Sequence, residues 1–279
     1  MKPNTVIVGF HEDQPSDIVL SETHLLKDLR YSKIGRSEVV EYFTSNDFVP
    51  KELNMPADRL TSTEYLQIIN DIMNLNKNLC IARHFGKFDR EISLKQSGKR
   101  YIDVWPSHLF KPDDHGLRWD NSSLFVLQMA CILSMSSKWK SATLRVFICV
   151  DSLQDMHYQE LQLKALLEQL RIKAKSVMVP WDHVVSQMDR IAMQSYKNIS
   201  EFPISFVRAV NEMIRRNSAD TSVCFLNLPP PPFVDGATAA AGDAPEISER
   251  YLQALRTLTD DLPPSLLVYG ISSVISTAL

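Results

Sequence analysis

Hydrophobic positions along this 279-residue chain form short apolar runs that alternate with longer segments of helical periodicity. The run Thr5–Phe10 is continuous and rich in β-branched residues, which is typical of a strand covered on both faces. Comparable runs predict further strands over Leu79–Ala82, Arg100–Trp105, Thr143–Val150, Ile172–Val179, Thr221–Leu228 and Ser265–Tyr269.

Helices are predicted between these runs. Thr61 and Glu64 have the spacing of a capping box, and the residues that follow place one apolar face at Tyr65, Ile68, Ile69, Ile72 and Met73. Periodicity also predicts helices over Glu22–Tyr31, Ser37–Phe43, Ser123–Met135, Met156–Leu170 and Pro203–Arg215, and a last one that Ser248 caps and that carries Tyr251, Leu252, Leu255 and Leu258.

Strands and helices that alternate, with connections longer than a hairpin turn, favour βαβ units. We therefore expect an α/β fold with mostly parallel sheets covered by helices. The segment Pro229–Pro245 is a proline run followed by an alanine- and glycine-rich stretch, which is the composition of a flexible linker.

Charge and apolar length limit the partners of the chain. A net charge of −3 gives no reason to expect nucleic acid. The most apolar helix, Ser123–Met135, is too short to cross a bilayer, and no secretory signal is visible at Met1–Phe10. Lys138, Lys140 and Arg145 form a local cationic cluster, which we interpret as a solvated loop rather than an anionic-lipid or phosphate site.

Few residue patterns point to chemistry. Glycine-rich phosphate loops, a GxSxG motif and paired metal-binding histidines are missing from the sequence, and Asp113, Asp114 and His115 share one loop that we read as a solvated turn. Nucleotide binding by another geometry stays open. The four cysteines stand in apolar runs and are expected to be buried and reduced: Cys80, Cys131, Cys149 and Cys224.

Asp103 is the one acidic residue inside a strongly apolar strand. It could act as a poised acid or base, but a place on the polar side of the strand or a helix cap is the favoured interpretation. The prolines Pro229, Pro230, Pro231 and Pro232 could contact an SH3- or WW-type groove, although a stiff exit from the preceding strand is favoured. We assign no catalytic, cofactor-binding, metal-binding or ion-transport residue.

Several segments, in order, resemble the C-terminal cytosolic domains of the cation–chloride cotransporters, solute carrier family 12. They are KPNTVIVGF (Lys2–Phe10), YIDVW (Tyr101–Trp105), FVLQMACIL (Phe125–Leu133), KWKSATLRVFIC (Lys138–Cys149) and ALLEQLRIKAKSVMVPW (Ala165–Trp181). Pro106, the loop after it and the ending Leu255–Leu279 are most similar to the cotransporter-interacting-protein branch of the family.

The resemblance implies two related halves similar to universal stress proteins, at residues 1–180 and 181–279, and self-association. It also implies that the first half lacks N-terminal strands, so that Thr5–Phe10 lies at an uncovered edge. The function expected is a non-enzymatic regulatory domain on the cytosolic face of a membrane, which controls chloride-coupled cation (potassium) symport through the transmembrane part. The alternative is a stand-alone nucleotide-binding module of the universal-stress-protein type.

Overall fold

The computed structural model describes residues 4–11, 60–85, 100–110, 119–150, 153–188, 195–232 and 242–271. Seven strands in this part of the chain form one sheet in the order β1-β2-β7-β6-β3-β4-β5. Their bounds are β1 Thr5–Gly9, β2 Asn78–Arg83, β3 Tyr101–Trp105, β4 Thr143–Val150, β5 Lys175–Pro180, β6 Thr221–Asn227 and β7 Ser265–Tyr269. Neighbouring strands are parallel except β2 and β7, which are antiparallel. The expected α/β class with mostly parallel strands is confirmed.

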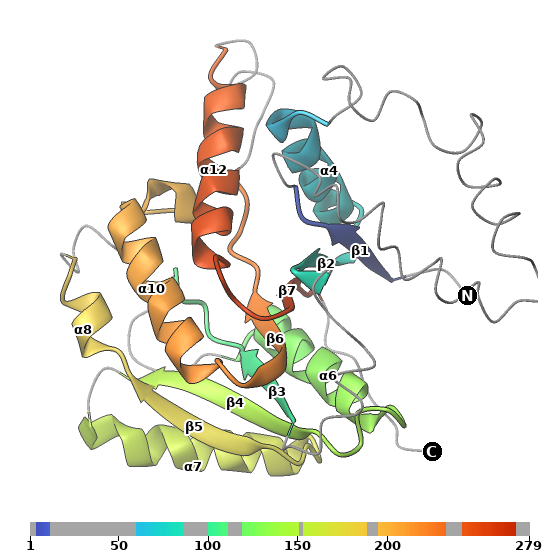
Figure 1. Ribbon diagram of the computed structural model, residues 1–279, viewed down its shortest axis with the longest axis vertical. Helices are drawn as coiled ribbons and strands as arrows, with labels where there is room; N and C mark the ends of the chain where they lie inside the picture. Colours follow the sequence, from blue (N-terminus) through green and yellow to red (C-terminus); the bar gives the residue numbers. More distant parts are fainter. Residues whose placement is uncertain are drawn as a thin grey trace, which may run out of the picture.

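Helices cover both faces of the sheet (Figure 1). The longer helices are α4 Ser62–Asn74, α6 Asn121–Met135, α7 Leu153–Gln169, α10 Ile204–Asn217 and α12 Ala244–Leu258, and the short ones are α8 Asp182–Val185 and η3 Ile199–Glu201. The helices α6 and α7 pack on one face, whereas α4, α10 and α12 pack on the other.

Alternation along the strands divides the core between these two faces. In β2, Leu79 and Ile81 belong to the cluster under α4, α10 and α12, while Cys80 belongs to the cluster under α6 and α7. On the face that α4, α10 and α12 cover, Trp105 stacks on Phe147 with ring centroids 4.6 Å apart. The indole N–H of Trp105 donates to the Ser218 hydroxyl at 3.1 Å. Continuous apolar strands of this kind are what a sheet buried on both faces requires.

Strand β1 departs from the predicted burial. It forms the edge of the described sheet and pairs with β2 alone, and the Ile7 side chain is 63% exposed. The prediction that both faces of Thr5–Phe10 are covered is therefore wrong. An apolar run cannot by itself distinguish a central strand from an edge strand.

The predicted division at residue 180 does not correspond to separate sheets. Strands β6 and β7, which come from residues 181–279, lie between β2 and β3. Strand β7 pairs with β2, and β6 pairs with β3. Residues from both parts of the chain belong to the core clusters on the two faces of this sheet. The division into two related halves stays a prediction.

The helix ends mostly follow the sequence. Thr61 and Glu64 form the predicted capping box on α4, and α6 begins two residues before its predicted start because the Asp120 carboxylate accepts from the Ser123 N–H. The predicted cap at Ser248 is wrong. Helix α12 begins at Ala244, and Ser248 is buried inside it, where its hydroxyl donates to the Ala244 carbonyl at 2.7 Å. The predicted helices over Glu22–Tyr31 and Ser37–Phe43 lie outside the described residues.

Candidate functional site

The carboxyl ends of β3 and β6 are where an open α/β sheet would ordinarily bind a ligand. The two strands are parallel neighbours, but the chain leaves β3 toward α6 on one face and leaves β6 toward α12 on the other. A crevice at such a reversal of direction is the usual ligand site of doubly wound folds. We call this region, formed by residues 105–110, 120–123 and 227–230, the carboxyl-end cluster.

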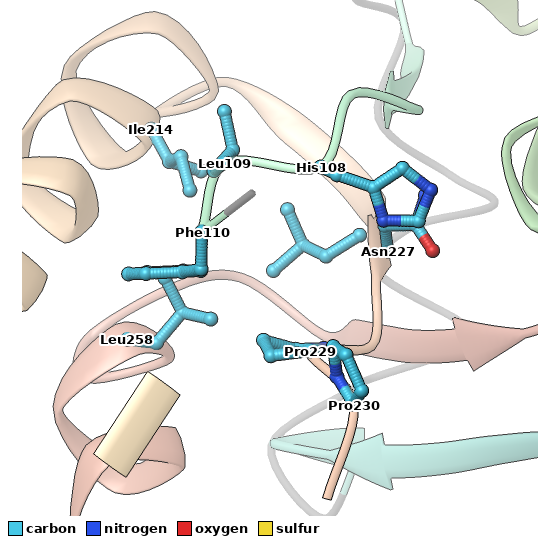
Figure 2. Close-up of a pocket in the computed structure, with 9 residues that line it drawn as sticks. His108, Leu109, Phe110, Ile214, Asn227, Pro229, Pro230 and Leu258 are labelled. Carbon is cyan, nitrogen blue, oxygen red and sulfur yellow. The ribbon is translucent and has the colours of Figure 1, made fainter. Parts of the chain in front are cut away.

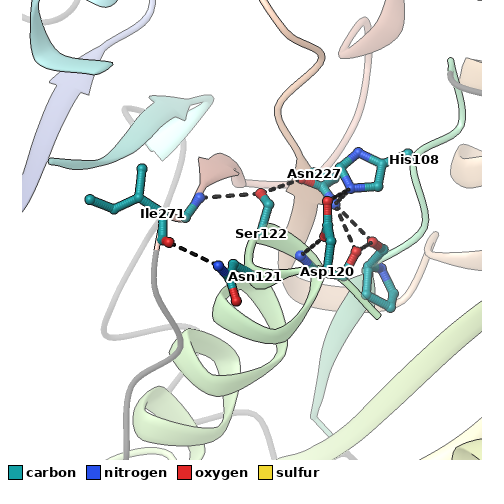
Figure 3. Close-up of polar contacts among 9 residues, drawn as sticks. His108, Asp120, Asn121, Ser122, Asn227 and Ile271 are labelled. Atoms are coloured by element: carbon teal, nitrogen blue, oxygen red, sulfur yellow. Dashed lines mark hydrogen bonds and ion pairs between the residues drawn. The ribbon is translucent and has the colours of Figure 1, made fainter. Parts of the chain in front are cut away.

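Hydrogen bonds close the carboxyl-end cluster (Figure 3). The buried Asn227 amide donates to the Pro106 carbonyl at 2.8 Å, and its oxygen accepts from the Ser122 hydroxyl at 2.8 Å. The Ser123 hydroxyl donates to the same Pro106 carbonyl at 2.8 Å, and the Gly270 N–H donates to Ser122. The network ties together β3, β6, α6 and the residue that follows β7. Its polar groups are therefore used by the protein itself.

His108 and Asp120 form the outer part of the cluster, with 2.7 Å between the imidazole Nε2 and the carboxylate. Asp120 also caps α6 by accepting from the Ser123 N–H at 2.8 Å. Partial burial disfavours the charged carboxylate, but hydrogen bonds from His108 and Ser123 outweigh it and hold the pKa of Asp120 below its usual range. A histidine and a carboxylate could in principle serve proton transfer, but here the carboxylate is committed to the helix end.

The hollow beside this cluster is small (Figure 2). It measures about 10 Å³, which is room for roughly one water molecule, and its lining is mainly apolar: Leu109, Phe110, Ile214, Leu226, Pro229, Pro230 and Leu258, with His108 and Asn227 at one side. A nucleotide does not fit into a space of this size. The position that the topology favours is filled by side chains of the chain.

Asp103 is fully buried, and its carboxylate forms a bidentate pair with Arg145 on the neighbouring strand, with both N–O distances 2.7 Å. Burial raises the pKa of the Asp103 carboxyl, and the hydrogen bonds from Arg145 oppose that rise. The expected place on the polar side of the strand agrees with this pairing, whereas the complete burial of Asp103 was not predicted. The prediction of a solvated loop is wrong for Arg145, which lies in β4, whereas Lys138 and Lys140 are exposed in a turn as expected.

The cysteines are free thiols. Cys80 and Cys224 are buried as predicted, and Cys131 and Cys149 are only partly covered. Burial raises the pKa of the Cys80 thiol to about 12, which disfavours a nucleophilic thiolate. Within the described ranges no three histidine, cysteine or acidic side chains come together as a metal site, and Asp113, Asp114 and His115 lie outside those ranges.

The proline run packs along the molecule. Pro229 and Pro232 are buried, the Tyr251 hydroxyl donates to the Pro229 carbonyl at 2.8 Å, and the Asn70 amide donates to the Pro232 carbonyl at 3.4 Å. Pro230 and Pro231 are partly covered. These contacts agree with a stiff exit from β6. A contact with an SH3- or WW-type groove stays a prediction. Among the described residues, no helix has the length and apolar character needed to span a membrane.

Comparisons with known proteins identify the family. The family model described as solute carrier family 12 matches residues 94–205. The whole chain aligns with solute carrier family 12 member 9 of Danio rerio at 35% identity and of Homo sapiens at 31% identity. It spans 30% and 32% of the length of these two relatives. The vacuolar cation-chloride cotransporter 1 of Saccharomyces cerevisiae is 26% identical over 65% of the chain and 17% of its own length.

One solved structure, the cytoplasmic domain of a prokaryotic cation chloride cotransporter, overlaps 96% of this chain and 86% of its own, with a TM-score of 0.41 and 14% identity. The sequence relatives carry the assignment. They show that the chain belongs to solute carrier family 12.

Proposed function

We propose that this chain is the regulatory and interaction domain of a cation:chloride symporter relative, on the cytosolic face of the membrane that holds the transmembrane part. The observation that carries the proposal is the alignment of the whole chain with about a third of family members that are much longer. In this account the domain binds the transmembrane part and a second copy of itself, and it controls coupled movement of chloride and a cation such as potassium.

The site geometry supports a role other than catalysis. The carboxyl-end cluster uses its polar groups for internal hydrogen bonds, and the buried Asp103 is paired with Arg145. A catalytic group has to reach a substrate, and these groups face other parts of the same chain. The surfaces, rather than a cleft, are then the parts through which the domain acts.

The transport role is tested in the parent protein. A full-length parent is compared with a version that lacks this segment and with one that carries a core substitution such as Leu226→Asp, which places a charge in a fully buried position. We expect both changes to reduce chloride-dependent rubidium uptake per molecule at the cell surface. Unchanged uptake at equal surface abundance would contradict a regulatory role.

Self-association is tested on the isolated chain by sedimentation equilibrium over the micromolar range. We expect a reversible increase in mass from monomer to dimer. A single monomeric species at all concentrations would remove dimerisation from the proposal and leave the transport role to the uptake experiment.

The nucleotide-binding alternative has one observation in its favour, the reversal of chain direction at β3 and β6. The closed carboxyl-end cluster and its hollow of about 10 Å³ are against it. A melting curve with and without ATP distinguishes the regulatory-domain hypothesis from the nucleotide-binding hypothesis, because a ligand that binds only the native state raises the melting temperature. We expect no saturable rise, and a clear one would favour the alternative.

A further inference from the structure

The opposite end of the sheet, where β4 and β5 begin, carries a concentration of positive charge. The last turn of α6 leads into the turn 136–142 and then β4, and the end of α7 leads into β5 (Figure 1). Five cationic side chains are exposed there, and we call them the basic end: Lys138, Lys140, Arg171, Lys173 and Lys175. Within the described part of the chain, none of the five forms an ion pair.

Carboxylates are scarce in the same segments. Residues 136–145 contain no aspartate or glutamate, and residues 164–175 contain Glu168 alone. The chain as a whole has a net charge of −3, whereas residues 136–145 and 164–175 together carry an excess of positive charge. An excess of unpaired surface cations produces a local positive potential that attracts anions over about a Debye length, roughly 8–10 Å at physiological salt.

A groove opens at the basic end between α7 and the first residues of β4 and β5. It measures about 560 Å³, and its apolar wall includes Leu144, Leu167 and Ile172. Lys164, Lys173, Lys175 and Glu168 line it together with that wall. Lys164 is bound to Glu160 on its own helix at 2.6 Å, so the cations free for a ligand are Lys173 and Lys175.

Large apolar side chains accompany these charges. Ile132 and Met135, in the last turn of α6, are 42% and 52% exposed. Trp139 lies between Lys138 and Lys140 and is partly covered by the core under α6 and α7. Lysines beside a tryptophan and exposed aliphatic groups are the combination that binds the headgroup region of a membrane.

We propose that the basic end and its apolar neighbours Ile132 and Met135 form a surface that binds an anionic membrane. Four of the five cations are lysines, which act as separate point charges, and they belong to two segments of the chain rather than converging on one point. That distribution matches a sheet of phosphate headgroups better than one bidentate ligand. The proposal concerns the surface of this chain and does not depend on the transport activity of the parent.

The test is co-sedimentation of the purified 279-residue chain with vesicles of phosphatidylcholine alone or with added phosphatidylserine. We expect binding to the anionic vesicles only, reduced at least tenfold by about 0.5 M salt, because screening then acts over only a few ångströms. Equal binding to both vesicles, or none to either, would overturn the proposal. Saturable binding of a soluble polyphosphate by a chain that binds neither vesicle would overturn it too, because the ligand would then be a small anion.

Substitutions locate the surface. Lys138→Gln with Lys140→Gln is expected to weaken vesicle binding by about tenfold or more, since each lysine near an anionic surface contributes about fivefold. The matched control is Lys197→Gln with Arg208→Gln, which removes the same charge from exposed positions elsewhere and should bind as the parent does. An equal loss in both pairs would show that net charge alone drives binding and would overturn the assignment.

The apolar contribution is tested with Met135→Ser, against Leu161→Ser on the exposed face of α7 as the control. We expect a several-fold loss for Met135→Ser and none for Leu161→Ser. All of these residues are exposed, so unchanged melting temperatures verify that the variants are folded. A loss with Leu161→Ser and none with Met135→Ser would place the binding surface on α7 and contradict the proposal.

Discussion

The two ends of the sheet differ in what their polar groups do. At the carboxyl end, Asn227, Ser122 and Ser123 bind one another and the Pro106 carbonyl, and the remaining hollow has room for about one water. At the amino end of β4 and β5, lysines are exposed beside an open groove. The end that usually binds ligands in α/β proteins is closed here, and the end that is usually structural offers a surface.

The largest expected effect on stability distinguishes Arg145, which is paired with a buried carboxylate, from the exposed lysines of the basic end. Arg145→Met leaves the buried Asp103 carboxylate without its partner, and we expect a loss of about 3–5 kcal/mol in the free energy of unfolding. Lys138→Gln, in the exposed turn before β4, should change it by less than about 0.5 kcal/mol. Urea unfolding measures both.

The double variant Asp103→Leu with Arg145→Met is the control for this pair. Replacing both charges by apolar groups is expected to recover most of the loss, because no charge is then buried alone. If Arg145→Met costs no more than Lys138→Gln, Asp103 and Arg145 are not the buried pair described here.

The tight packing behind the carboxyl end is tested with Gly270→Ala. A Cβ atom at Gly270 would lie 2.6 Å from Cγ of the buried Phe125, so the core has to shift. We expect a loss of about 1–3 kcal/mol in unfolding free energy from overpacking. Gly9→Ala in β1 meets no atom within 4 Å and is the matched control, with an expected change near zero. Equal effects would show that the carboxyl end is loosely packed.

The hydrogen bonds of the carboxyl end are tested with Asn227→Ala. The substitution leaves the buried Ser122 hydroxyl without its acceptor, and we expect a cost of about 1–2 kcal/mol in unfolding free energy. Asn121→Ala removes a comparable but exposed hydrogen bond to the Ile271 carbonyl and should cost less than about 0.5 kcal/mol. A neutral Asn227→Ala would mean that the network does not hold this end closed.

A smaller effect depends on pH. Asp120→Ala removes the cap of α6, and we expect a loss of about 1 kcal/mol in unfolding free energy at neutral pH. Because the folded pKa of Asp120 is lowered, the unfolded chain binds the proton more readily, and the stabilisation is present above the ordinary pKa of about 4. The difference between the parent and Asp120→Ala should therefore shrink as the pH falls below about 4. A difference that is constant down to acid pH would contradict a charged cap.

The sequence predicted the elements better than their arrangement. Capping at Thr61 and the apolar runs at Leu79 and Thr143 depend on local patterns, so their helix and strands were expected within a few residues. The strand order was not, because the insertion of β6 and β7 between β2 and β3 depends on contacts between distant segments. The start of α12 was placed too late because serine is a common N-cap residue and Ser248 was taken as the cap. Helix α12 begins after Asp243, with Pro245 in its first turn.

The sites show the same limit. Asp103 was recognised as unusual, but its partner Arg145 is 42 positions away, and strand register alone brings the two together. Lys138 and Lys140 were interpreted as a solvated loop rather than an anionic-lipid site, and the membrane-binding surface proposed here departs from that interpretation. Lys173 and Lys175 join the two lysines only when β4 and β5 pair. Periodicity predicts which residues share one face of a single helix or strand. A surface formed by several elements can be recognised only once the arrangement of those elements is known.

The most direct test of the difference between the two ends is backbone hydrogen exchange of the chain with and without phosphatidylserine vesicles. We expect added protection in residues 132–142 and 169–175, with no change in residues 105–110 and 227–232. Protection confined to the carboxyl end, with the segments of the basic end unchanged, would contradict it.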